Sequence, residues 1–139
     1  MSSGLPFRRE RQFNEQSMTR NIRIVPDIPN VEALAITGDN PSHKAYDILI
    51  LPGGGPGAKT FSTSESVLGL INAFTNAEKY VAAICAGTTA LVAAHQRYGG
   101  KKAIVTSHPS VREVIETENG WEYSEERVVI DGNIITSRG

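Results

Sequence analysis

Several kinds of residue are scarce in this sequence, and each scarcity excludes a class of protein. There is one cysteine, Cys85, among 139 residues, which excludes an internal disulfide framework and a multi-cysteine zinc site. The 14 basic and 15 acidic residues leave a net charge of −1, whereas nucleic-acid and anionic-membrane partners require a concentrated basic surface. No apolar run approaches the roughly 18 residues of a membrane span, and the N-terminus lacks the apolar core of a secretory signal. These absences indicate a soluble cytoplasmic protein.

The length fits one domain preceded by a short segment of different composition. Residues 1–19 carry three arginines against Glu10 and Glu15 and show no apolar period, so they are predicted to be a disordered or atypical lead-in. A mitochondrial transit peptide is the disfavoured alternative because of the two acidic residues. Residues 20–139 are predicted to form the domain.

The apolar pattern of this domain predicts alternating strands and helices. Residues 46–51 and 80–84 are continuous apolar runs, which are typical of strands covered on both faces. A helix is predicted after a capping box at Ser62 and Glu65, and another after Cys85-Ala86-Gly87, through about Arg97. Later segments predict a strand, a helix and a hairpin, at 103–106, 111–116 and 128–136. This order favours an α/β fold with a mostly parallel sheet, with one face bare near the last strand because no covering helix follows it.

Three features lie where the predicted strands end, the edge at which open α/β sheets gather ligands. Cys85 stands between a strand and a helix, as a nucleophile on a sharp turn does; the alternative is a buried structural cysteine. The glycine turn at 53–55 offers backbone N–H groups to an oxyanion. A phosphate cradle is the competing interpretation of that turn, but its usual glycine patterns are missing.

His108 follows the next predicted strand and is a candidate general base or thiolate partner for Cys85. Such a base usually has a third group to orient it, and none of the carboxylates has a convincing position. His43 and His95 are assigned no role. No ligand cluster for a metal is present in the sequence pattern.

Four segments occur in an order that resembles the ThiJ/PfpI superfamily, in its branch of parkinsonism-associated deglycases. They are Tyr46-Asp47-Ile48-Leu49-Ile50-Leu51-Pro52-Gly53-Gly54, Ala82-Ala83-Ile84-Cys85-Ala86-Gly87, Ser107-His108-Pro109 and Ile135-Thr136-Ser137-Arg138-Gly139. The resemblance covers residues 20–139. It implies a flavodoxin-like three-layer α/β sandwich, a homodimer and no cofactor.

The resemblance also implies roles for individual residues. Cys85 matches the reactive cysteine and His108 its partner, while Gly53, Gly54 and Ala86 match the oxyanion and substrate-binding positions. Arg20 matches an anion-contacting arginine. Methylglyoxal-type aldehydes are the implied substrates, through glyoxalase III-like or protein deglycase-like chemistry. Two alternatives remain: a redox-responsive cysteine stress sensor or chaperone without turnover, and an inactive fragment of the family.

The chain departs from the superfamily pattern at both ends. The family's first strand, its glutamate-bearing helix and its C-terminal helix have no counterpart in the sequence, so the domain is expected to be truncated. Because the first strand would be central, its absence predicts an unpaired sheet edge. The resemblance also makes a nuclear location compatible, beside the cytoplasmic one.

Overall fold

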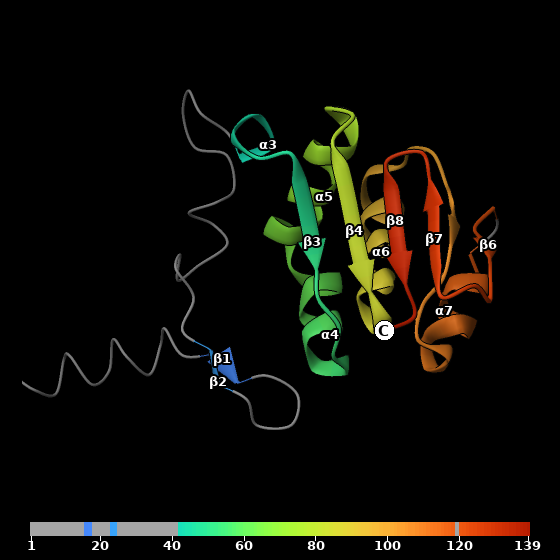
Figure 1. Ribbon diagram of the computed structural model, residues 1–139. Coiled ribbons are helices and arrows are strands. Elements are labelled where there is room, and N and C mark those ends of the chain that lie inside the picture. The colour runs from blue at the N-terminus through green and yellow to red at the C-terminus, as the bar shows by residue number, and fades with distance from the viewer. Residues whose placement is uncertain (1–15, 18–22, 25–41, 119) are drawn as a thin grey trace, which may run out of the picture.

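A computed structural model describes residues 16–17, 23–24, 42–118 and 120–139 of the chain. Short helices and strands alternate along this part, as the sequence predicts (Figure 1). In chain order the elements are β1 (Gln16–Ser17), β2 (Arg23–Ile24), α3 (Ser42–Ala45), β3 (Ile48–Leu51), α4 (Gly55–Thr63), α5 (Glu65–Asn76), β4 (Tyr80–Ile84), the 3₁₀ turn η2 (Cys85–Gly87), α6 (Thr88–Tyr98), β5 (Ile104–Val105), the 3₁₀ turn η3 (Pro109–Val111), α7 (Arg112–Glu116), β6 (Glu122–Tyr123), β7 (Val128–Asp131) and β8 (Ile134–Ser137).

The main sheet has the strand order β3-β4-β8-β7. Strands β3, β4 and β8 run parallel, with Leu49 beside Val81 and Ala83 beside Thr136. Strand β7 pairs antiparallel with β8 across the predicted hairpin, whose Gly132 has a φ of 59°. Strands β5 and β6 form a separate parallel pair beside β7. The parallel strands therefore bring their carboxyl ends to one edge, where Cys85 lies.

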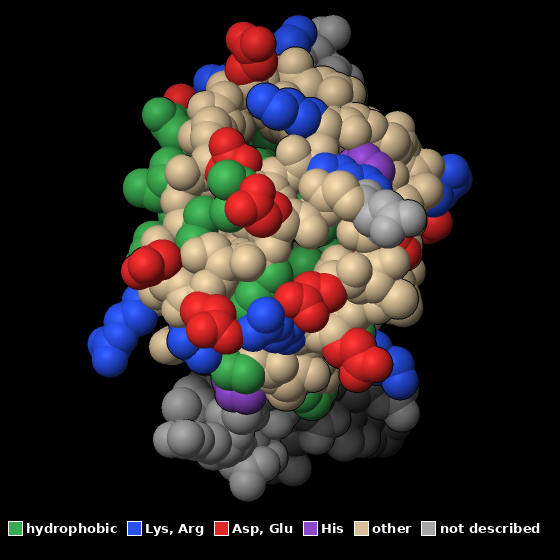
Figure 2. Space-filling model, turned by 90° about the vertical axis from the view of Figure 1, so that its right-hand side faces the viewer, with side chains coloured by type: hydrophobic (Ala, Val, Ile, Leu, Met, Phe, Trp, Pro, Cys, Tyr) green, Lys and Arg blue, Asp and Glu red, His purple; other side chains and the backbone are tan. Residues whose placement is uncertain are grey.

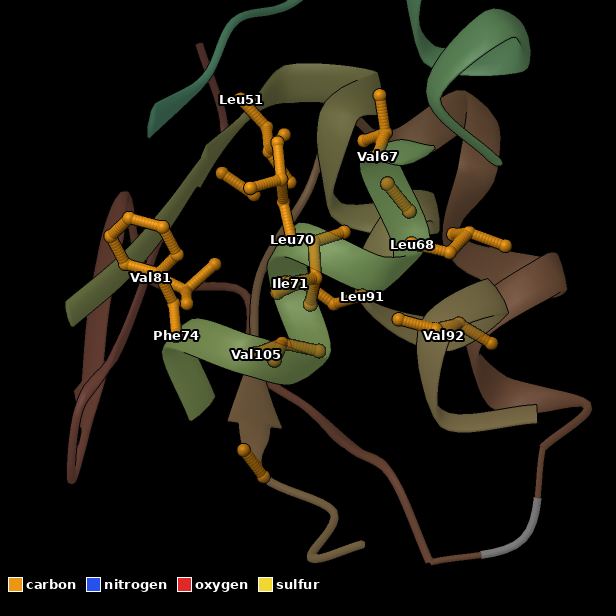
Figure 3. Close-up of a cluster of buried hydrophobic side chains, with 14 of the residues drawn as sticks. Leu51, Val67, Leu68, Leu70, Ile71, Phe74, Val81, Leu91, Val92 and Val105 are labelled. Atoms are coloured by element: carbon orange, nitrogen blue, oxygen red, sulfur yellow. The ribbon is translucent and has the colours of Figure 1, made fainter. Parts of the chain in front are cut away.

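One face of the main sheet packs on the helices and makes the core (Figure 3). Alternate residues of β3 and β4 point to this face, including Leu51 and the fully buried Val81. The predicted apolar stripe of α5 meets them, and Phe74 is its largest buried side chain. Small residues of α6, such as Ala90, let that helix approach the sheet closely. The core thus fixes the turn between β4 and α6.

The opposite face of the main sheet is apolar and uncovered within the described residues. We call it the open sheet face; the pairing registers place on it Ile48, Ile50, Tyr80, Ala82, Ile84, Val128, Ile130, Ile135 and Ser137. Ile130 is 69% exposed and Ile50 54% exposed. The bare face predicted near the last strand is confirmed. The prediction that β3 and β4 are covered on both faces is wrong for the described residues, because continuous apolar runs do not reveal whether a second helical layer is present.

Replacing Ile130 with threonine is expected to change the free energy of unfolding by no more than about 0.5 kcal/mol, because the side chain makes few core contacts and both residues favour strands. Val81→Ala on the covered face is the control and should lose roughly 1.5–3 kcal/mol. Urea denaturation measures both values. A loss for Ile130→Thr as large as that for Val81→Ala would mean that the open sheet face is covered in solution.

Strand β3 forms an edge of the main sheet in the described part of the chain, since it pairs with β4 and with no second strand. This is the unpaired edge expected from the family resemblance of the sequence. The pairing of β1 with β2 places Gln16 beside Ile24. The rest of the predicted lead-in lies outside the described residues.

Helix α4 is the longest of the elements that the sequence analysis missed. Its start at Gly55 follows a glycine run that is typical of a turn, yet Pro56 suits the first turn of a helix, where its missing N–H is not needed. The predicted capping box is wrong: Ser62 lies inside α4, where its hydroxyl donates to the Ala58 carbonyl at 2.8 Å. Ser64 instead caps α5 and accepts from the Val67 N–H at 3.4 Å.

Figure 2 shows the side of the molecule formed by β6 and α7, on which acidic and basic side chains lie interspersed. Arg112 joins two of the acids there, with Nε 2.8 Å from Glu116 and Nη1 2.5 Å from Glu125. Hydrogen bonds from Arg112 to these two carboxylates raise its pKa above the ordinary value. The same guanidinium lies 4.7 Å above the Tyr123 ring. These contacts connect α7 to the strand and loop that follow it.

Candidate functional site

Cys85 lies at the turn where β4 ends and η2 begins, followed at once by α6. Its φ is 60°, a left-handed backbone conformation that few residues other than glycine adopt. Backbone strain of this kind is held in place by surrounding packing and concentrates at functional sites. The strand-turn-helix context predicted for Cys85 is therefore confirmed, and the residue is partly exposed rather than fully buried.

Two glycines from different segments, Gly53 and Gly139, lie close to Cys85. A Cβ at Gly53 would lie 2.8 Å from Cys85 Cβ and 3.6 Å from its Sγ. A Cβ at Gly139 would lie 2.9 Å from the same Cβ and 3.3 Å from Sγ. Both positions are thus closed to a larger side chain while Cys85 keeps its place. The sequence analysis singled out Gly53 for its N–H and missed Gly139, whose only signal was its place in the last family segment.

Close backbone contact also joins the end of β3 to the turn after Cys85. A Cβ at Gly87 would lie 2.9 Å from the Pro52 carbonyl oxygen and 3.0 Å from that of Leu51. Gly54 has a φ of 105° and occupies the N-cap of α4, while Ala86 is buried within η2. The structure therefore gathers the predicted Gly53, Gly54 and Ala86 around Cys85.

His108 reaches this site from the end of β5. Its backbone N–H donates to the Cys85 carbonyl oxygen at 3.1 Å, so the two chain segments are directly joined. The imidazole is exposed, and within the described residues its ring bonds to Ser110 and not to the Cys85 sulfur. The predicted proximity of the two residues is seen in the backbone.

Ser110 is the group that orients the imidazole. Its backbone N–H donates to His108 Nδ1 at 3.1 Å, and its hydroxyl lies 2.7 Å from the same nitrogen. Because the Ser110 N–H donates to Nδ1, the proton of the neutral ring lies on Nε2 in this geometry, and the hydroxyl can donate to Nδ1 as well. The search for a third group among carboxylates missed it. A serine two positions after a histidine at a turn was the available signal.

Buried hydrogen bonds of threonine residues connect the segments that position the site. Thr88 Oγ1 donates to the Thr106 carbonyl at 2.9 Å, and the Thr106 N–H donates to Thr136 Oγ1 at 2.9 Å. All three threonines are fully buried. Ser107 continues the network, since its carbonyl accepts from the Tyr123 hydroxyl at 3.0 Å. Buried hydrogen bonds of this kind hold the start of α6 and the ends of β5 and β8 in one arrangement.

Three points from the sequence analysis remain: the place of Arg20, a metal site and a membrane span. Arg20 lies outside the described residues. Among the described residues, no group of three or more His, Cys, Asp or Glu side chains is arranged to hold a metal ion. No described helix has both the length and the apolar character needed to cross a bilayer.

Comparisons with known proteins identify relatives of this chain. The chain is 38% identical over 123 residues to a Danio rerio protein named Parkinson disease protein 7 homolog. The aligned region covers 87% of the chain and 59% of that relative. It is 44% identical over 97 residues to a Schizosaccharomyces pombe protein named glutathione-independent glyoxalase DJ-1, covering 69% of the chain and 48% of the relative. The chain therefore spans about half to three-fifths of the length of these relatives.

Solved structures show the same fold. The crystal structure of Drosophila melanogaster DJ-1beta superposes with a TM-score of 0.76 at 30% identity, over 91% of this chain and 62% of that one. The predicted flavodoxin-like α/β fold with its mostly parallel sheet is confirmed. The model of the DJ-1/PfpI family matches residues 15–139, and the chain accordingly belongs to the DJ-1/PfpI family.

Proposed function

We propose that the protein converts methylglyoxal-type 2-oxoaldehydes to 2-hydroxy acids, with Cys85 as the nucleophile. The observation that carries this proposal is the strained, partly exposed Cys85 at the carboxyl end of β4, joined to His108 through the backbone. A relative carries the name glutathione-independent glyoxalase DJ-1. The test is whether the purified chain consumes methylglyoxal and releases lactate without added glutathione.

The first step is attack of the Cys85 sulfur on the aldehyde carbon. A C–S bond forms, and the proton of the thiol passes to the aldehyde oxygen, which gives a hemithioacetal. The backbone N–H groups of Gly54 and Ala86 are proposed to stabilise the negative charge that develops on that oxygen. Both residues lie in turns that adjoin Cys85, so these donors sit on backbone held by the core.

The second step moves hydrogen within the substrate. The hydrogen on the former aldehyde carbon leaves as a proton and a proton is delivered to the neighbouring carbon. The hydroxyl proton on the former aldehyde carbon leaves as well, and the neighbouring ketone oxygen gains a proton, which produces a thioester of the 2-hydroxy acid. Water then cleaves the C–S bond, adding its hydroxyl to the acyl carbon and its proton to the sulfur. The sum is one water added to one 2-oxoaldehyde, so no oxidant or cofactor enters the balance.

His108 is proposed to transfer these protons. For Nε2 to act as a base, the ring must carry its proton on Nδ1; Nδ1–H would then donate to the Ser110 hydroxyl, and the contact of Nδ1 with the Ser110 N–H would be lost. When Nδ1 accepts from the Ser110 N–H, Nε2 has the proton and can donate it. Ser110 is thus a positioning residue that supports both forms of the ring.

Replacing Ser110 with alanine is expected to lower kcat about three- to tenfold with KM nearly unchanged, because the acceptor for Nδ1–H is lost while the substrate contacts stay. Steady-state kinetics with methylglyoxal measure both constants. Ser110→Thr keeps the hydroxyl and is expected to restore most of kcat. Equal kcat values for the alanine variant and the parent would exclude this role for Ser110.

A second candidate function rests on the partial exposure of the single cysteine. An accessible cysteine can be oxidised to a sulfenic or sulfinic acid, and the protein would then act as a sensor of oxidative stress. Intact mass measurement after mild peroxide treatment tests this, since the sensor interpretation requires oxygen addition at Cys85. A chain that turns over methylglyoxal and gains no oxygen would favour the first function.

A further inference from the structure

A cavity lies at the end of the sheet opposite Cys85. It has a volume of about 360 Å³ and is bordered by the last turns of α5 and α6 and by the β7–β8 turn at 131–133. Figure 1 shows that this turn and the C-terminus, which lies beside Cys85, are at opposite ends of β8. The volume is in the range of small-molecule sites. Neither the proposed reaction nor its residues involve this cavity.

The inner wall of the cavity is apolar and contains an aromatic pair. Leu91, Ile71 and Trp121 are buried members of the core that line it. The His95 ring meets the Trp121 ring edge to face, with centroids 5.8 Å apart. Trp121 is 9% exposed, and its Nε1–H has no acceptor among the described residues. That nitrogen is itself buried, so Trp121 lines the cavity with its ring and not with its N–H.

The rim of the cavity carries more cationic than anionic side chains. Lys79, Lys101 and Lys102 line it, against Glu78 and Asp131. Asp131 Oδ2 already accepts from the Ile104 N–H at 2.8 Å. Lys101 and Lys102 have no hydrogen-bond or ion-pair partner in the described part of the chain, while Lys79 has a 3.4 Å contact with the exposed Asp47. Two lysines therefore remain available to a ligand.

Several carbonyls at the ends of the two helices already have donors other than these lysines. The carbonyl groups that finish α5 and α6 carry a partial negative charge that attracts cations when they lack donors. Here the Ala77 and Lys79 N–H groups donate to the last turn of α5, and the Gly99 N–H donates to the His95 carbonyl at 2.7 Å. His95 Nε2 donates to the Gly100 carbonyl, also at 2.7 Å. These carbonyls therefore have donors other than the lysines, and the ammonium groups of Lys101 and Lys102 have no partner within the described residues.

We infer that this cavity binds a small molecule with an apolar, ring-sized body and one anionic group. The body would pack on Trp121 and Leu91, and the anion would be bound by Lys101 and Lys102 at the rim. This site is independent of Cys85, because the two lie at opposite ends of the sheet. A ligand there would adjoin the β7–β8 turn and the helix ends, so it would stabilise the folded chain when bound.

Trp121 is the only tryptophan in the sequence, so its indole N–H gives one side-chain signal in a ¹H–¹⁵N spectrum. The probes are 4-phenylbutyrate, the uncharged 4-phenylbutan-1-ol and phenyl phosphate. The inference predicts a saturable shift of the indole signal with 4-phenylbutyrate and binding about fivefold weaker for the alcohol. Comparing the carboxylate with the phosphate shows which anion the lysines prefer, and either preference agrees with the inference.

The lysines and the other site are tested with variants. A Lys101→Gln/Lys102→Gln double variant should bind 4-phenylbutyrate about fivefold more weakly, while Lys59→Gln on exposed α4 is the matched control and should bind as the parent does. Cys85→Ser should also bind normally. An unshifted indole signal, equal affinity for acid and alcohol, or loss of binding in Cys85→Ser would each overturn the inference. None of these outcomes depends on turnover of methylglyoxal.

Discussion

Replacing Cys85 with alanine is expected to reduce methylglyoxal consumption by at least roughly a thousandfold, because no other thiol in the chain can form the hemithioacetal. The folded structure should survive the change. Alanine keeps the Cβ atom, which is the side-chain atom of Cys85 that packs closest to Gly53 and Gly139. The unfolding free energy should therefore stay within about 1 kcal/mol of the parent. Consumption is followed by the loss of methylglyoxal, and stability by urea denaturation of the same samples.

Cys85→Ser serves as the matched variant, since it preserves the shape and the polar side chain but supplies a weaker nucleophile. It should resemble Cys85→Ala in activity and the parent in stability. A folded alanine variant that consumes methylglyoxal at the parent rate would exclude Cys85 as the nucleophile. A variant that loses activity together with its unfolding transition would show instead that Cys85 is needed for the fold.

Replacing Gly87 with alanine is expected to lower the free energy of unfolding by about 1–3 kcal/mol and to impair turnover as well. The new Cβ would meet the Leu51 and Pro52 carbonyl oxygens at 3.0 and 2.9 Å, and these backbone atoms cannot move without shifting the end of β3. Because Gly53 follows directly, the wall beside Cys85 would shift with them. Urea denaturation and methylglyoxal kinetics measure the two effects.

Gly57 offers the control for this experiment. It lies inside α4, and a Cβ added there would have no neighbouring atom within 4 Å, so Gly57→Ala should be neutral or should stabilise by up to about 1 kcal/mol through helix propensity. If Gly87→Ala were as stable as Gly57→Ala, the close approach of β3 to the turn after Cys85 would not exist in solution.

Much of the fold could be predicted because the apolar pattern along the chain is regular. The runs at β3 and β4, the stripe of α5 and the Asp131-Gly132 turn each have a local signal strong enough to define an element. Helix α4 could not be found in this way, since glycine, proline and three hydroxyl residues give it no apolar stripe. The coverage of β3 could not be predicted either, because burial on the second face depends on residues far away in sequence.

Some residues of the candidate site could likewise be predicted from the sequence, and others could not. Cys85 and His108 could be predicted because each follows a strand, although β5 pairs with β6 beside the main sheet and not within it. Ser110 and Gly139 could not, because their roles depend on distances between segments that the pattern does not encode. The hydrogen bonds of the buried threonines could not be predicted either, since the sequence does not indicate which residue of a distant segment a threonine contacts.

The most direct measurement of the central claim is the amount of lactate formed per chain. A ¹H nuclear magnetic resonance time course with methylglyoxal in large excess distinguishes turnover from simple modification of the thiol. The proposed mechanism regenerates Cys85 in each cycle, so it predicts many equivalents of lactate from the parent chain and none above background from Cys85→Ala. Methylglyoxal loss without lactate, or lactate limited to one equivalent per chain, would contradict it.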